Sequence, residues 1–102
     1  MATSRIDTLR QMADLQPDSV FVRYGLAMEY VKAGEMANAI SEFEAVLGVD
    51  PAYSAAYYHG GQTFEKMGKL DEARDLYRRG LANSRDPHAR GELEAALSIL
   101  GD

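Results

Sequence analysis

The sequence repeats its turn-forming residues at a fixed interval. Pro17 and Pro51 are 34 positions apart, and so are Gly34 and Gly68. Shifting the sequence by the same interval aligns further pairs of identical or similar residues: Tyr24 with Tyr58, Lys32 with Lys66, Ala39 with Ala73, Phe43 with Tyr77 and Leu47 with Leu81. A period of this length is typical of repeat proteins, in which each unit buries its apolar face only against neighbouring units. The sequence therefore predicts a repeat architecture.

Each half of the period has the pattern of an amphipathic helix. Apolar residues recur three and four positions apart within residues 20–30 and again within residues 36–47, which places them on one helical face. Gly34 and Gly68 stand between such segments, where glycine adopts the left-handed conformation that ends a helix. The repeating unit is therefore expected to be a hairpin of two short antiparallel helices.

These residues resemble the tetratricopeptide repeat family, whose units carry a Trp-x2-Leu-Gly-x2-Tyr…Ala-x3-Phe…Pro pattern over 34 residues. The matching positions are Leu26, Ala27, Tyr30, Ala39, Phe43 and Pro51 in the first unit, Tyr57, Gly61, Phe64, Ala73 and Tyr77 in the second, and Gly34 and Gly68 at the turns. The departures are Arg23, Gly60, Gly80 and Arg85. The resemblance implies an all-α fold, a right-handed superhelical stack of antiparallel helix hairpins with about six helices.

The resemblance also divides the chain, which is a single domain by its length of 102 residues. The expected parts of this 1–102 domain are an N-terminal half repeat at 1–17, full repeats at 20–53 and 54–87, and a C-terminal capping helix at 88–102. Ser4 is a candidate N-cap for the first helix, with Asp7 completing a capping box. Asp86 and Pro87 supply an N-cap and a first helical residue for the last helix.

Two adjacent glycines, Gly60 and Gly61, lie inside a predicted helix, where each costs about 1 kcal/mol relative to alanine. Gly61 occupies a position at which the family pattern has a small residue, and we expect it to face Ala73 where the two helices of the hairpin cross. Gly60 replaces a leucine of the pattern. The space beside it is expected to be filled by Tyr57 or Tyr77, or to remain open for a ligand.

Composition and motifs argue against several functional classes. The net charge of −5 disfavours general binding to nucleic acid or to an anionic membrane. Cysteine is absent, and His59 and His88 lack metal-ligand spacing. No nucleophile elbow or phosphate-binding loop is present. We therefore expect no enzyme activity, no catalytic residues, no cofactor and no metal site.

The sequence gives no indication of a membrane or secretory destination. The residues after Met1 lack the apolar core of a secretion signal, and no run approaches the ~20 apolar residues of a membrane span. The chain is expected to be cytoplasmic.

The resemblance implies where a partner binds, because the first helices of the family's repeats line a concave groove. Carried over by position, the groove residues are Phe21, Tyr24, Met28, Tyr58, His59, Gln62, Glu65 and Glu94. Their apolar and aromatic members lie off the predicted core stripe, and an exposed cluster of that kind is often a contact surface. For Phe21 the alternative is packing against the preceding N-terminal helix.

The resemblance also bears on the kind of partner. Some family members grip the terminal carboxylate of heat-shock chaperones with a set of Lys, Asn, Lys and Arg. The corresponding positions here are Tyr24, Met28, His59, Gly91 and Ala95. We therefore expect a non-catalytic interaction module, an adaptor or scaffold, that binds a hydrophobic or mixed peptide or helix of another protein, and not a chaperone tail. The alternative is a self-assembling domain that forms a homodimer through its terminal helices or its groove.

Arginines gather near the C-terminus of the second repeat: Arg74, Arg78, Arg79, Arg85 and Arg90. One interpretation is a patch for an acidic partner or RNA. The other is a solvated helix face on which arginines pair with Asp71 and Asp75 at helical spacing. The negative net charge favours the second interpretation.

Overall fold

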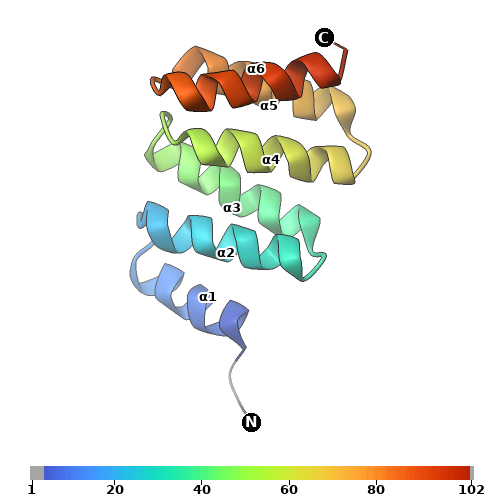
Figure 1. The fold of residues 1–102 in the computed structure, drawn as a ribbon. Coiled ribbons are helices and arrows are strands. Elements are labelled where there is room, and N and C mark those ends of the chain that lie inside the picture. Colours follow the sequence, from blue (N-terminus) through green and yellow to red (C-terminus); the bar gives the residue numbers. More distant parts are fainter. Residues whose placement is uncertain (1–3, 102) are drawn as a thin grey trace.

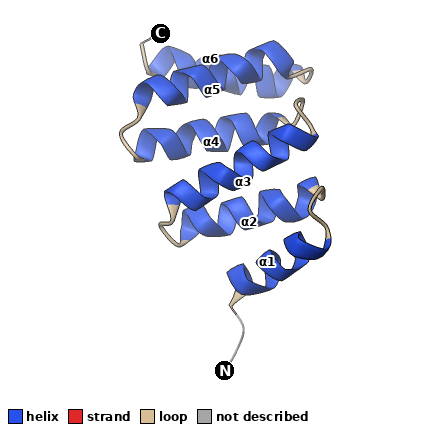
Figure 2. Cartoon of the chain, turned by 180° about the vertical axis from the view of Figure 1, so that it is seen from behind, coloured by secondary structure: helices blue, strands red, loops and turns tan. Residues whose placement is uncertain are grey.

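The computed structural model describes residues 4–101, and these residues form helices and connecting turns without a strand (Figures 1 and 2). The helices are α1 (Arg5–Leu15), α2 (Val20–Lys32), α3 (Met36–Val49), α4 (Ser54–Lys66), α5 (Leu70–Asn83) and α6 (Pro87–Ile99). Residues 1–3 and 102 of the predicted domain lie outside the described residues. The predicted all-α fold is confirmed.

The helices stack in chain order, so that α1 and α6 lie at opposite ends of an elongated molecule of 46 × 27 × 18 Å (Figure 1). α2 pairs with α3 and α4 pairs with α5, while α1 packs against α2 and α6 packs against both α4 and α5. α2, α4 and α6 form one layer of the stack, and α3 and α5 lie behind them in the same view. The structure is thus the predicted stack of helix hairpins.

Glycine ends the first helix of each full hairpin, as the spacing predicts. Gly34 and Gly68 have φ angles of +79° and +76°. The residue after each glycine donates its N–H back into the helix, from Glu35 to the Tyr30 carbonyl and from Lys69 to that of Phe64, both at 2.9 Å. A Cβ at either glycine would meet no atom within 4 Å, so the backbone conformation and not crowding requires glycine there.

Side-chain caps begin the two outer helices. The Ser4 hydroxyl accepts the N–H of Asp7 at 3.0 Å at the start of α1. The Asp86 carboxylate accepts the N–H of Ala89 at 3.0 Å, and Pro87 is the first residue of α6. Both predicted N-caps are confirmed, because these acceptors satisfy N–H groups that have no partner inside their helices.

The repeat-signature residues form the core. Ala27, Ala39, Phe43, Ala73 and Tyr77 have no exposed surface. The small residues among them allow the helices to approach closely, the Phe43 ring packs against Gly60 of the next hairpin, and the Tyr77 ring packs against Gly61 within its own hairpin. These positions are therefore occupied as the family pattern predicts.

The Tyr77 ring is the nearest neighbour of Gly61 across the hairpin. A Cβ at Gly61 would lie 2.2 Å from Cε1 of Tyr77, so this ring comes nearer to Gly61 than the predicted Ala73 does. Tyr77 lies one helical turn after Ala73 on the same face of α5, and its larger ring reaches the crossing point.

The space beside Gly60 is filled, but by neither of the two predicted tyrosines. A Cβ at Gly60 would lie 2.7 Å from Cδ2 of Leu76 and 3.6 Å from Cβ of Phe43. α3 and α5 thus both fill the volume that a leucine of α4 would occupy. The alternative of an open ligand pocket at Gly60 is excluded.

Gly80 marks a third close approach that the sequence did not reveal. A Cβ there would lie 2.8 Å from Cβ of Tyr57, an atom fixed to the α4 backbone, and 2.8 Å from Cδ1 of Leu93 in α6. The glycine that departs from the family pattern therefore allows α5 to pack closely against both α4 and α6.

The arginine cluster mainly ties helices to one another. Arg74 donates to Asp71 at 2.9 Å and to the carbonyl of Leu100, just after α6, at 2.9 Å. Arg79 reaches Glu44 on α3 at 3.2 Å. These contacts support the interpretation of a structural, solvated helix face.

Among the described residues, no helix combines the length and the hydropathy that crossing a membrane requires.

Candidate functional site

A groove runs between α4 and α6, on the layer that also contains α2 (Figure 1). We call it the α4–α6 groove. It consists of two hollows of about 380 Å³ and about 250 Å³. Tyr58 and Glu92 line both hollows and mark the boundary between them.

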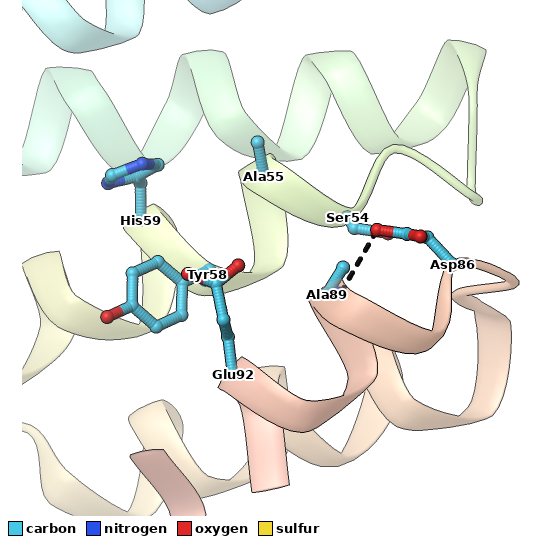
Figure 3. Close-up of a pocket in the computed structure, with 7 residues that line it drawn as sticks. All are labelled: Ser54, Ala55, Tyr58, His59, Asp86, Ala89 and Glu92. Atoms are coloured by element: carbon cyan, nitrogen blue, oxygen red, sulfur yellow. Dashed lines mark hydrogen bonds between the residues drawn. The ribbon is translucent and has the colours of Figure 1, made fainter. Parts of the chain in front are cut away.

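The larger hollow lies toward the N-termini of both helices and is shown in Figure 3. Its lining residues are Ser54, Ala55, Tyr58 and His59 on α4, and Asp86, Ala89 and Glu92 at the start of α6. The smaller hollow continues along the same helices, and its lining residues are Tyr58, Gln62, Glu65, Glu92, Ala95, Ala96 and Ile99. The spacing of three and four residues on each helix gives one continuous stripe on α4 and one on α6.

The structure brings four of the predicted groove residues together. Tyr58, His59, Gln62 and Glu65 all line the α4–α6 groove. They follow from the register of α4, which the internal repeat defines.

The predicted residues of α2 do not line either hollow. Tyr24 is half-buried and approaches the groove through His59, with 6.2 Å between the ring centroids. Met28 is half-buried and packs against the core. Phe21 is 84% exposed, so it does not pack against α1 as the alternative interpretation required.

Glu94 lies apart from the other predicted residues. It lines a separate hollow with Leu97, Ser98 and Gly101. Successive residues of an α-helix are rotated by about 100°, so Glu94 is roughly opposite Glu92, the residue that does face α4.

An aromatic cluster connects α2 with the groove. The ring of Tyr24 lies 5.3 Å from that of Tyr53, and the rings of Tyr58 and His59 meet edge to face at 5.3 Å. Burial, and secondarily the neighbouring Tyr53, raises the pKa of Tyr24. Tyr53 lies in the turn before α4, and sequence reasoning missed it because it considered only helical positions.

His59 is neutral at pH 7 in this environment. Burial lowers the pKa of His59 below its ordinary value of 6.5, and nearby Lys66 acts in the same direction, while the carboxylate of Glu92 opposes the shift. The aromatic side of the groove therefore carries no positive charge from His59.

Glu65 is held in place from the opposite layer of the molecule. The Tyr77 ring passes under α4 at Gly61, and its hydroxyl donates a hydrogen bond to the Glu65 carboxylate. Burial, followed by this bond, raises the pKa of Tyr77 far above its ordinary value of 10.0. Tyr77 thus remains a donor, and it orients a carboxylate that lines the smaller hollow.

The α6 side supplies residues that sequence reasoning missed. Asp86 and Glu92 line the groove, and the Glu92 side chain extends from α6 toward α4 beside Tyr58 (Figure 3). Within residues 4–101, no three His, Asp or Glu side chains gather into a cluster that could hold a metal ion. The groove offers aromatic faces, one amide and several carboxylates, which are suited to binding a partner molecule.

Comparison with known proteins agrees with the geometry. The sequence model of the tetratricopeptide repeat family matches residues 24–89. The TPR repeat-containing protein PA0015 of Pseudomonas aeruginosa is 30% identical over 95 residues, which cover 93% of this chain and 90% of that protein.

Solved structures share the fold. A tetratricopeptide repeat domain protein from Salinibacter ruber is 32% identical, with a TM-score of 0.73 over 80% of this chain and 94% of that one. The first TPR of Spaghetti (RPAP3), solved with an HSP90 peptide, is 24% identical, with a TM-score of 0.73 over 95% of this chain and 80% of that one. The chain belongs to the tetratricopeptide repeat family.

Proposed function

We propose that the chain is a non-catalytic interaction module that binds a peptide or helix of a partner protein in the α4–α6 groove. The observation that carries this proposal is the pair of adjoining hollows with Tyr58 between them. Tyrosine supplies a large contact area with few rotatable bonds and is enriched among the residues that dominate binding energy. The family is known chiefly for such interactions, which supports the assignment to a binding module.

The groove is a poor site for a chaperone's terminal carboxylate. The first TPR of RPAP3 was solved with an HSP90 peptide, but at 24% identity that likeness extends to the fold alone. Here Tyr24 and Met28 stand where the clamp would need cationic or amide side chains, and His59 is neutral at pH 7. A carboxylate would find no charged donor at these positions.

The proposal is tested by selecting peptides from a random phage-displayed library on the full chain and measuring their affinity by fluorescence anisotropy. Tyr58→Ala should weaken binding by about tenfold or more, because truncating a central contact residue commonly costs about 2 kcal/mol. Leu15→Ala is the matched control, since Leu15 is 83% exposed on α1, outside the groove. Failure to select any peptide, or equal effects of the two variants, would reject the proposal.

Self-association is a second candidate function, because large apolar side chains are exposed at both ends of the stack. Leu15 on α1 and Ile99 on α6 are each 83% exposed. Sedimentation velocity over a concentration series tests this alternative. A dimer that dissociates in the Leu15→Ser variant supports it, and a monomer at every concentration excludes it.

A further inference from the structure

The lining of the α4–α6 groove is negatively charged. Asp86, Glu92 and Glu65 line its two hollows, whereas no lysine or arginine is among the lining residues. His59, the one lining residue with a basic side chain, is neutral at pH 7 because burial lowers its pKa. A concave surface of one sign focuses its field on an approaching ligand of the opposite sign.

Glu65 is more than a surface carboxylate, because the core fixes its position. Gly61 leaves space for the Tyr77 ring to pass beneath α4, and the Tyr77 hydroxyl donates to Glu65. Tyr77 has no exposed surface, so this donor is itself held by the packing of the repeat. A carboxylate oriented in this way loses little conformational freedom when it accepts a second hydrogen bond.

Glu92 faces Glu65 across the smaller hollow, from α6. Its side chain extends toward α4 beside Tyr58, where both residues line the larger hollow as well (Figure 3). The imidazole of His88 lies 3.9 Å from Glu92, and it is 85% exposed. Asp86 differs from these two residues, because its carboxylate caps α6 by accepting the N–H of Ala89.

We infer that the α4–α6 groove selects a partner segment with a lysine or arginine side chain, whose cationic group lies between Glu65 and Glu92. This inference rests on the proposed function and specifies the chemistry of the bound peptide. The aliphatic stem of the same side chain lies along the ring of Tyr58, which attracts a cation to its face as well. The two carboxylates accept charge-assisted hydrogen bonds, which are stronger than neutral ones.

The test uses peptides selected on the full chain from the random library, together with the double variant Glu65→Gln/Glu92→Gln. We expect selection on the wild-type chain to enrich lysine and arginine, and the double variant to bind the enriched peptides at least about tenfold more weakly. Glutamine keeps the size of each side chain and still accepts the Tyr77 hydroxyl, so circular dichroism should show an unchanged fold.

Glu72→Gln/Glu94→Gln is the matched control, because it removes the same charge from the exposed side chains of α5 and α6 outside the groove. The affinity of this control for the enriched peptides should stay within about twofold of the wild type. Any long-range electrostatic effect of the two removed charges should disappear when salt is added.

The outcomes separate this inference from the proposed function. Peptides that depend on Tyr58 but show no basic enrichment, or that bind both double variants equally, would overturn the inference and leave the peptide-binding groove in place. Peptides that bind regardless of Tyr58→Ala would overturn both.

Discussion

Replacing Gly61 with alanine perturbs a close crossing of α4 and α5. The added Cβ would lie 2.2 Å from Cε1, 2.6 Å from Cζ and 2.7 Å from Cδ1 of the Tyr77 ring. The ring cannot easily retreat, because Tyr77 has no exposed surface and its hydroxyl is bonded to Glu65. Relief therefore requires α4 and α5 to separate.

The expected loss of stability follows from two opposing terms. Overpacking a core costs about 1–3 kcal/mol and sometimes more, and three rigid ring atoms inside contact distance place Gly61→Ala at the upper end of that range. Alanine has a higher helix propensity than glycine by about 1 kcal/mol, which offsets part of this loss. The net result is a loss of about 2 kcal/mol in the free energy of unfolding, or a decrease of about 10 °C in Tm for a domain of this size.

Urea denaturation followed by circular dichroism measures this loss. Gly91→Ala is the control, because a Cβ at this mid-helix position of α6 would meet nothing within 4 Å, so this variant should gain about 0.5–1 kcal/mol. The double variant Gly61→Ala/Tyr77→Leu should be less damaged than the two single losses predict, because leucine removes the ring. If Gly61→Ala were stabilised as much as Gly91→Ala, the packing argument would be refuted.

Three further perturbations test other features of the structure. Tyr77→Phe should lower the free energy of unfolding by about 1.5–3 kcal/mol, because it deletes a hydrogen bond to the charged Glu65. Since burial and that bond raise the pKa of Tyr77, the wild type should also lose stability as pH rises above 10.0. Urea denaturation across alkaline pH should show a smaller loss in the variant. In the His88→Gln variant, NMR titration of the remaining His59 should give a pKa below 6.5, because burial disfavours its charged form. The free energy of unfolding should decrease as pH falls from 6.5 through the pKa of His59, and a titration midpoint at or above 6.5 would contradict its burial. Gly68→Ala should cost about 1–2 kcal/mol by thermal melting, because φ is +76° there, and an unchanged Tm would show that the turn tolerates a side chain.

The helices could be predicted from the sequence because local chemistry defines their ends. Gly34 and Gly68 adopt positive φ at the turns, and Ser4 and Asp86 accept N–H groups at the N-caps. The small and aromatic residues between these marks repeat at a fixed interval. Each of these features depends on a residue and its near neighbours in the chain.

Contacts between helices were harder to predict than the helices themselves. Several large side chains could have filled the space at Gly60, and the residues that do so, Leu76 and Phe43, come from two other helices. Local spacing does not determine which side chain reaches such a point. The same limit explains why the sequence did not reveal that the Tyr77 ring comes nearer to Gly61 than Ala73 does.

The groove residues of α4 were easier to predict from the sequence than those of α6. The internal repeat defines the register of α4, so the sequence placed Tyr58, His59, Gln62 and Glu65 on one stripe, and these residues line the two hollows. Glu94 follows Tyr58 by 36 positions, the interval between Pro51 and Pro87, but only one side of α6 faces α4. The sequence therefore pointed to Glu94, whereas the helix directs Glu92 toward α4.

NMR chemical-shift mapping with a peptide selected on the full chain tests the central claim, that a partner segment binds between α4 and α6. Binding in the groove should produce the largest changes in amide shifts at Tyr58, Gln62 and Ala95, which line the groove from both helices. Changes confined to α3 and α5 on the opposite layer, with none at these three residues, would contradict it.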